Sequence, residues 1–235
     1  MNAATRFHRR FADNRNQQSV ATRLRRRRFQ ILLDMINTTE GRLTILDIGG
    51  QPQYWEMMIA GESLPRNIQV TLLNVETHAV SRPNFTSVVG DGRAMPQFAD
   101  RQFDIVFSNS TIEHVGDFPD QQRMAAEVRR VGRQYYVQTP NRYFPIEPHF
   151  MFPLFQFLPI GLRVWLLQHF DLGWHPRLPD RHDAQREVTG IRLLSRRDVV
   201  ALFPEATIFE EKYCGLVKSF VAYTAPAGRP ASVRS

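Results

Sequence analysis

Residues 43–50 read LTILDIGG, and this stretch decides the fold that the sequence predicts. Residues 43–48 are apolar or β-branched apart from Asp47, which is typical of a strand buried on both faces of a sheet. Gly49 and Gly50 come directly after it and indicate a turn at the carboxyl end of that strand. With a helix expected over residues 53–60, the stretch predicts one strand–turn–helix unit of a parallel sheet.

Strands and helices alternate along the chain beyond this unit. Apolar residues at three- to four-residue spacing predict helices over residues 20–36 and 119–131. Alternation of this kind is typical of a parallel sheet with helices on both of its faces. Besides 43–48, apolar runs predict strands over residues 68–75, 85–89, 103–108 and 134–138.

The last part of the chain predicts one more helix and two more strands. Ser195 and Asp198 have the spacing of a capping box at the start of a helix over residues 195–203. Strands are expected over residues 206–213 and 219–224. The link between them, residues 214–218, has five residues and is too short for a crossover helix, so this pair must be antiparallel. The predicted fold class is therefore α/β, with a seven-stranded, mostly parallel sheet.

Length and composition fit one folded domain with two flexible ends. The chain has 235 residues, of which 43% are hydrophobic, and α/β folds often form one domain of this size. We expect a basic, flexible arm over residues 1–19, one domain over residues 20–224 and a flexible tail over residues 225–235. Cys214 is the only cysteine, which excludes a disulfide within the chain and a cysteine-rich zinc site, and which fits a cytoplasmic location.

The positive charge lies almost entirely at the N-terminal end. The formal net charge is +7, yet residues 1–28 alone contain nine arginines and a single acidic residue. Arg23 and residues 25–28 leave nucleic-acid binding open, because arginines neutralise phosphates. No aromatic side chains alternate with these arginines, so nucleic acid is not the expected partner. A solvated helix start and contact with anionic lipid near the apolar insertion are alternatives of equal weight to nucleic-acid binding. The first 30 residues lack the apolar stretch of a secretory signal, although an arginine-rich start also fits a transit peptide.

Polar residues follow each of the predicted parallel strands. In an open α/β sheet, ligands bind beyond the carboxyl ends of the strands, so these residues are expected to face one cleft. A glycine lets the backbone approach a ligand closely, and a carboxylate or amide after the second strand can accept hydrogen bonds from ribose hydroxyls. The candidate cofactor-binding residues are Asp47, Gly49, Gly50, Asn74, Glu76, Asp91, Gly92, Asn109 and Ser110.

In order and spacing, these groups resemble the class I S-adenosylmethionine (SAM)-dependent methyltransferases, and more narrowly the methyltransferase type 11 group. Residues 46–50 (LDIGG) resemble the first motif of that family, and residues 89–96 (VGDGRAMP) resemble its adenine-side motif with Asp91 as the acid. Residues 103–115 resemble the fourth strand and the motif after it. The resemblance covers about residues 43–140. It implies a Rossmann-like sheet of seven strands with the last one antiparallel, SAM as the cofactor, and methyl transfer as the activity.

The first loop departs from the family pattern. The family usually has Asp-x-Gly-x-Gly-x-Gly there, whereas Gln51 and Gln53 stand at the second and third glycine positions. A SAM-fold protein that binds without catalysing therefore stays open as an alternative, as does a methyltransferase associated with RNA or lipid. The nicotinamide-binding pattern G-x-G-x-x-G does not fit this loop, because its second and third glycines are missing after Gly49.

His114 is the candidate catalytic base. Methyl transfer needs an acceptor lone pair aimed at the methyl group, and often a base within hydrogen-bond reach of the acceptor's proton. His114 comes after the fourth strand, and a neutral imidazole is a suitable base near pH 7. The alternative is a histidine that only packs against the start of a helix. We expect a small-molecule acceptor that is methylated at oxygen.

Metal-assisted transfer is the alternative to a simple base. Glu113 and His114 are similar to part of the Glu-x-x-Glu-His cluster of ubiquinone-pathway and small-RNA methyltransferases, with Ser110 in place of the first glutamate. Glu147 and His149 follow the fifth strand. Two carboxylates and two imidazoles can hold a divalent ion that lowers the pKa of an acceptor hydroxyl. In the other interpretation Glu147 and His149 only cap a turn, and the sequence predicts no metal.

Residues 141–190 form a long insertion that is rich in aromatic side chains. A loop of this length is usually functional, and this one is too aromatic for disorder. We expect a lid over an apolar or aromatic acceptor. The alternatives are a surface helix that contacts membrane or a lipid-linked substrate, and additional core. Residues 150–170 are long enough to span a bilayer, but Pro153, Pro159 and Arg163 argue against a transmembrane helix.

Overall fold

A seven-stranded sheet forms the centre of the protein. The computed structural model describes residues 20–38, 41–59, 67–80 and 82–225. The strands lie in the order β3-β2-β1-β4-β5-β9-β8. β1 to β5 run parallel, whereas β9 is antiparallel to both of its neighbours, β5 and β8. The strand bounds are β1 (Leu43–Ile48), β2 (Ile68–Asn74), β3 (Phe85–Val89), β4 (Phe103–Asn109), β5 (Gly132–Pro140), β8 (Thr207–Tyr213) and β9 (Leu216–Tyr223).

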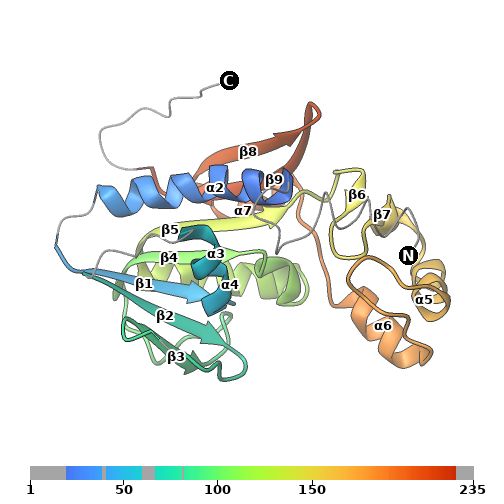
Figure 1. The fold of residues 1–235 in the computed structure, drawn as a ribbon, viewed down its shortest axis with the longest axis horizontal. Coiled ribbons are helices and arrows are strands. Elements are labelled where there is room, and N and C mark those ends of the chain that lie inside the picture. Colours follow the sequence, from blue (N-terminus) through green and yellow to red (C-terminus); the bar gives the residue numbers. More distant parts are fainter. Residues whose placement is uncertain (1–19, 39–40, 60–66, 81, 226–235) are drawn as a thin grey trace.

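Helices cover both faces of this sheet (Figure 1). α2 (Val20–Asn37) and α3 (Pro52–Ile59) pack on one face, and α4 (Phe118–Val131) and α7 (Arg196–Leu202) pack on the other. Each face has its own cluster of buried apolar side chains. The predicted fold class is confirmed.

Alternate residues of the central strands supply the two clusters. Ile45 of β1 and Ile105 of β4 pack toward α2 and α3, whereas Leu46 and Val106 pack toward α4 and α7. Successive side chains of a strand point to opposite faces, so a strand covered on both sides must be apolar at every position. Each such side chain stabilises the fold by about 1.5–3 kcal/mol relative to an exposed one. This explains why residues 43–48 are apolar or β-branched apart from Asp47.

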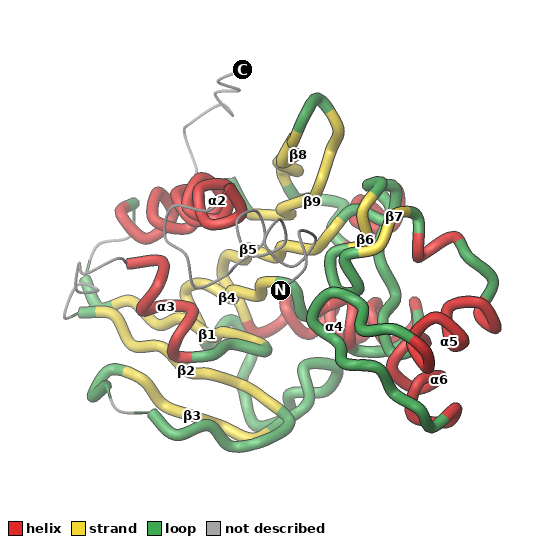
Figure 2. Tube along the Cα trace, turned by 45° about the vertical axis from the view of Figure 1, so that its right-hand side comes forward, coloured by secondary structure: helices red, strands yellow, loops and turns green. Residues whose placement is uncertain are grey.

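The insertion lies beyond the carboxyl ends of the strands, as Figures 1 and 2 show. It contains the short strands β6 (Ile146–Glu147) and β7 (Phe152–Pro153), the 3-10 turn η2 (Phe155–Phe157), and the helices α5 (Ile160–His169) and α6 (Arg181–Thr189). A third apolar cluster holds these pieces together, and its buried members are Phe150, Phe155, Val164, Leu167, Leu172, Ala184 and Val188.

Many apolar side chains of the insertion stay exposed. They include Tyr143, Leu154, Phe157, Ile160, Leu162, Trp165, Phe170 and Trp174. A lid that closes over an apolar acceptor and a surface that contacts membrane would both expose such side chains, so both roles stay predictions. Among the described residues, no helix combines the length and the apolar character needed to cross a bilayer.

The last hairpin is tighter than the sequence predicted. β8 and β9 are joined by two residues only, Cys214 and Gly215, and Tyr213 already pairs with Leu216. Both linking residues have positive φ, +50° and +78°, as the preferred two-residue hairpin turn requires. The expected five-residue link was therefore wrong, because the positive φ of Cys214 cannot be read from its identity. The antiparallel pairing is confirmed.

The helix starts follow the sequence signals. Ser195 caps α7, and its hydroxyl accepts from the backbone N–H of Asp198 while the Asp198 carboxylate accepts from the backbone N–H of Ser195, which confirms the capping box. Asp117 and Asp120 form a second capping box at the start of α4. The predicted basic arm, residues 1–19, lies outside the described residues, as does all but the first residue of the predicted tail.

Candidate functional site

The carboxyl ends of the parallel strands meet at one edge of the sheet. Ile48 of β1 pairs with Leu73 of β2 and Ser108 of β4, and Asn109 pairs with Gln138 of β5. Residues that follow parallel strands leave the sheet on the same side. The candidate cofactor residues therefore lie along a single edge, although the side chains of several of them are already bonded to other parts of the protein.

Asp47 is almost completely buried near the end of β1, where it is 1% exposed. Its Oδ2 accepts a hydrogen bond of 2.7 Å from the indole Nε1 of Trp55 in α3. Burial raises the pKa of Asp47 to about 7, and the bond from Trp55 opposes that rise. A Cβ on Gly50 would overlap the Asp47 carboxylate, so the loop folds this closely only because residue 50 is glycine. Asp47 thus fixes the loop and the start of α3.

Gly49 and Gly92 bring neighbouring loops close to the end of β1. Gly49 has φ +76°, which glycine adopts without strain, and a Cβ there would overlap the Thr111 side chain. Thr111 Oγ1 in turn donates 3.1 Å to the carbonyl of Ile48. A Cβ on Gly92 would lie 2.8 Å from Cγ2 of Ile48. These glycines are required by the packing of the protein itself.

Asn74 and Glu76 follow β2 with different roles. Asn74 Nδ2 donates 2.9 Å to the carbonyl of Gly50, so this amide ties the end of β2 to the glycine loop. Glu76 lies two residues beyond the end of β2 and is exposed. Of the two, Glu76 is the one placed to meet a ligand from solvent.

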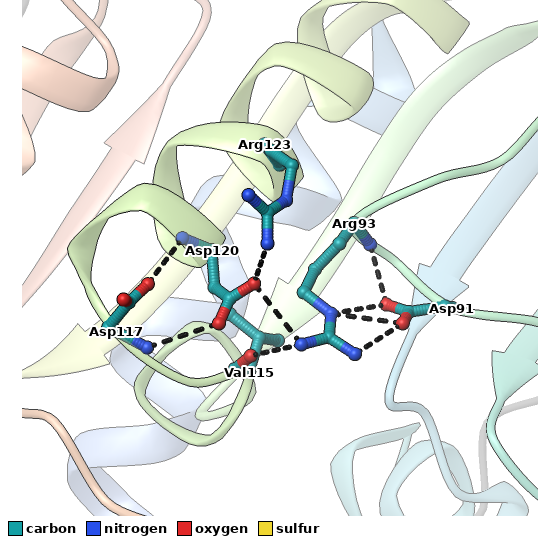
Figure 3. Close-up of polar contacts among 6 residues, drawn as sticks. All are labelled: Asp91, Arg93, Val115, Asp117, Asp120 and Arg123. Atoms are coloured by element: carbon teal, nitrogen blue, oxygen red, sulfur yellow. Dashed lines mark hydrogen bonds and ion pairs between the residues drawn. The ribbon is translucent and has the colours of Figure 1, made fainter.

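Asp91 is engaged by a neighbouring cation, as Figure 3 shows. Both of its carboxylate oxygens accept from the Arg93 guanidinium, and the shortest of these bonds, 2.6 Å, joins Arg93 Nη2 to Asp91 Oδ2. These bonds lower the pKa of Asp91. The Arg93 guanidinium also donates to the Val115 carbonyl and to Asp120 at the start of α4. Arg93 thereby joins the loop after β3 to the segment after β4.

Asn109 and Ser110 end β4. Ser110 has φ +54°, and its hydroxyl donates 2.8 Å to Oε1 of Gln138 on β5. Asn109 Oδ1 is buried and has no hydrogen-bond partner. A buried acceptor without a donor is unfavourable, so this atom marks a place where a ligand can supply one.

Glu113 lies in the short turn η1 (Ile112–His114) after β4, fully buried. Its Oε2 accepts 3.0 Å from the Thr139 hydroxyl, whereas Oε1 is buried without a hydrogen-bond partner. Burial raises the pKa of Glu113 to about 7, although the nearby His149 lowers it. The unpartnered Oε1 lies 4.0 Å from Nε2 of His149.

His114 and His149 meet edge to face with ring centroids 4.8 Å apart. The Glu147 carboxylate holds His149: Oε1 lies 2.7 Å from Nδ1, and Oε2 accepts from the backbone N–H of His149 and of Phe150. Burial alone would lower the pKa of His149, but the carboxylates of Glu147 and Glu113 raise it overall. Although His114 is partly exposed, loss of solvent around its ring and the neighbouring His149 lower its pKa to about 4.

Three of these groups can converge on one ion. Donor atoms of Glu113, His114 and His149 all lie within 4.8 Å of one another. Glu147 stands behind His149 as its hydrogen-bond partner rather than as a fourth donor. The structure thus brings together the four residues that the sequence singled out as a candidate metal set.

Comparison with known proteins agrees with this arrangement. Residues 57–134 match the family model described as a methyltransferase domain. The CurJ carbon methyltransferase has the same fold: the TM-score is 0.51 at 11% identity, covering 85% of this chain and 54% of that one. The chain has the fold of a SAM-dependent methyltransferase. The class I pattern recognised in the sequence is therefore confirmed.

Two further matches differ in identity and in coverage. A SAM-dependent methyltransferase from Methanosarcina mazei is 16% identical, with a TM-score of 0.46, over 81% of this chain and 95% of that one. The uncharacterized protein Rv1509 of Mycobacterium tuberculosis is 36% identical over 87 residues, which is 37% of this chain and 28% of that protein. The match therefore spans less than a third of the length of the curated relative.

The edge of this methyltransferase fold fits SAM by its donor set. Asn109 Oδ1 is a buried acceptor that lacks a donor, which an amino group can supply. The exposed carboxylate of Glu76 can accept from ribose hydroxyls. Asp47 and Asn74 support the loop between these two positions by their bonds to Trp55 and Gly50.

Several supporting residues of the methyltransferase edge were missed by sequence reasoning. Thr111 packs against Gly49, Trp55 donates a hydrogen bond to Asp47, and Arg93 donates to Asp91. Only Arg93 had a readable signal, because it stands two residues after an acid in a turn. The other two contacts join residues whose spacing in the sequence has no simple periodicity.

Proposed function

We propose that the protein transfers a methyl group from SAM to a hydroxyl oxygen of a small-molecule acceptor with an apolar or aromatic body. The observation that carries this proposal is the pairing of a SAM-type edge with His114 and Glu113 directly after β4, under an insertion rich in aromatic residues. SAM, when bound, supplies an electrophilic methyl group on a positively charged sulfur that leaves as a neutral thioether.

The residues of this chain would position the acceptor and take its proton. His114 is the candidate base because its lowered pKa keeps the imidazole neutral at pH 7, with a lone pair ready to accept a proton. His149 lies against the His114 ring and is itself held by Glu147. The buried faces of the insertion would exclude water from the acceptor, which strengthens the polar interactions around it.

Calorimetry and turnover test this proposal separately. We expect S-adenosylhomocysteine to bind the full chain, and Glu76→Gln to weaken binding because one acceptor of ribose hydroxyls is lost. With a panel of phenols as acceptors, His114→Ala should reduce turnover about 10²–10⁴-fold while cofactor affinity stays the same. His182→Ala, which removes an exposed histidine of α6, is the matched control. Absence of cofactor binding in the unmodified chain would refute the assignment.

A divalent ion is a second candidate for activating the hydroxyl. It is favoured by Glu113 Oε1, a buried carboxylate oxygen without a partner that lies beside His149 and His114. Glu147 fixes the ring of His149 in the way that carboxylates commonly orient metal-binding histidines. The ion would hold the acceptor oxygen and lower its pKa, so that His114 would act as a ligand and not as the base.

Titration of the EDTA-treated chain with Zn²⁺ or Mn²⁺ separates the two candidates. Binding that is lost in His149→Ala and kept in His182→Ala would support the metal. His182 is a suitable control because it belongs to an exposed donor group, with Asp180 and Asp183, elsewhere on the insertion. If the unmodified chain binds neither ion, the metal candidate is wrong and His114 remains the base.

A further inference from the structure

A cavity lies between the end of β5 and the insertion, on the far side of Glu147. Its volume is about 200 Å³. Arg142 enters it just after β5, Gln156 and Arg163 enter it from the insertion, and Arg192 enters it from the segment before α7. Glu147 in its wall is bonded to His149, whose ring meets that of His114 edge to face.

Two polar atoms of the cavity-lining side chains are buried without partners. They are the donor Nε of Arg163 and the acceptor Oε1 of Gln156. Exchanging the Oε1 and Nε2 positions of the Gln156 amide would not satisfy Oε1, because Nε2 already donates to the carbonyls of Arg142 (2.9 Å) and Phe144 (2.8 Å). Unmade bonds of buried groups are unfavourable, so a ligand that accepts from Arg163 and donates to Gln156 would stabilise this arrangement.

The charges in the cavity wall favour an anion. Neither Arg142 nor Arg163 forms an ion pair with a carboxylate of the described residues. Glu147 is the acidic residue of the wall, and both of its oxygens are already bonded to His149 and to the backbone N–H of Phe150. Guanidinium groups match carboxylates in shape and charge.

The remaining wall is apolar. Phe150 and Phe155 are buried, with ring centroids 4.3 Å apart, and Val188 of α6 adds a buried branched side chain. The volume is below that of typical drug-sized pockets, so a single ring with its substituents is the appropriate size. A ligand whose apolar part packs against these side chains would have its charged end at the arginines.

We propose that this cavity binds a small monoanionic carboxylate with an apolar ring. A carboxylate is favoured over a phosphate because the fixed negative charge of Glu147 in the same wall repels a dianion more strongly. So far as the ligand is the methyl acceptor, the inference rests on the proposed function: Arg163 would hold the acid end, and Gln156 Oε1 would accept from a hydroxyl of the ligand. A residue that binds the acid end in this way decides specificity without taking part in proton transfer.

Calorimetry on the full chain without SAM tests the inference, with benzoate as the probe and benzyl alcohol, acetate and inorganic phosphate as comparisons. We expect benzoate to bind, and each comparison to bind at least about tenfold more weakly. Arg163→Gln should weaken benzoate about tenfold or more, and Arg163→Lys less, because the charge remains. The matched control is Arg181→Gln, which changes an exposed arginine at the start of α6.

A second variant protects the test against a folding defect. Val188→Phe puts a larger side chain into the cavity wall without changing a charge, so it should abolish benzoate binding. Circular dichroism and the melting temperature report whether this buried position accepts the larger side chain with the fold kept. Unchanged benzoate affinity in Arg163→Gln and in Val188→Phe, or phosphate bound as well as benzoate, overturns the proposal. Benzoate binding without binding of S-adenosylhomocysteine would refute the proposed function alone, and the reverse would refute this inference alone.

Discussion

Asp47→Asn should remove a large pH dependence from the stability of the protein. Asp47 is buried, and among the described residues its bond is to the neutral indole of Trp55 rather than to a cation. Burial therefore raises its pKa from an ordinary 3.8 to about 7. The unfolded chain releases this proton above about pH 4, whereas the folded protein keeps it until about pH 7.

The sign follows from proton binding. Between these two pH values the folded state binds more protons than the unfolded state, so the free energy of unfolding falls as the pH rises. The fall ends above pH 7, where both states are ionised. A change in pKa from 3.8 to about 7 corresponds to about 4 kcal/mol. Asn keeps an oxygen that can accept from Trp55 but does not ionise, so the variant lacks this loss.

Urea unfolding between pH 4.5 and 8, with EDTA present, measures the effect. Glu113 has a raised pKa of the same kind, so the wild-type curve contains both contributions, and the difference from Asp47→Asn isolates Asp47. Asp100→Asn, which removes an exposed carboxylate, controls for net charge. If the wild-type and Asp47→Asn curves run parallel within about 1 kcal/mol, Asp47 is ionised in the fold and the reasoning from burial is wrong.

Three further substitutions test the supporting contacts. Gly50→Ala puts a Cβ onto the Asp47 carboxylate, so it should lower the free energy of unfolding by about 1–3 kcal/mol, as urea unfolding measures. It should also weaken the binding of S-adenosylhomocysteine in calorimetry. Unchanged values would contradict the close approach of Gly50 to Asp47. Arg93→Gln should cost less than about 1 kcal/mol in urea unfolding, because Arg93 and Asp91 are both more than a third exposed. Ser195→Ala should cost about 1 kcal/mol through the lost cap of α7, and Ser195→Thr should restore most of it.

The sheet could be predicted from the sequence because its physical cause is local. A strand covered by helices on both faces is mostly apolar, and residues 43–48 and 103–108 carry that pattern apart from Asp47, Asp104 and Ser108. The parallel direction of the first five strands followed from the strand–helix alternation, and the antiparallel pairing of the last two followed from their short link, whereas strand order and register were not predicted. The meeting of His114 with His149 was also accessible, because β4 and β5 are neighbours and both residues come after their ends.

The partners of the polar side chains could not be predicted in this way. Asp47 was expected to bind the cofactor, yet it is buried against Trp55, and Asn74 is tied to Gly50. These bonds join residues brought together by the turn after β1, and their geometry depends on backbone angles that composition does not reveal. The helix α5 was expected only as one alternative, a surface helix in the insertion. It is apolar on several sides and exposes Trp165, so it lacks the one-faced pattern by which helices are recognised.

The distribution of unpaired groups shows where ligands must contribute most. At the strand ends proposed to hold SAM, Asp47, Asn74 and Asp91 are already bonded to other parts of the protein, whereas Asn109 Oδ1 lacks a partner. On the side of β4, β5 and the insertion, Glu113 Oε1 and Arg163 Nε stay buried and unpartnered. We therefore expect a ligand of the insertion cavity to order its surroundings more than S-adenosylhomocysteine orders the strand ends. The melting temperature does not report this difference, because two ligands that bind only the folded state stabilise it equally at equal multiples of their dissociation constants. Hydrogen exchange over α5 and α6, compared with and without benzoate, decides this point: unchanged protection there would show that the acceptor side is as preformed as the cofactor edge.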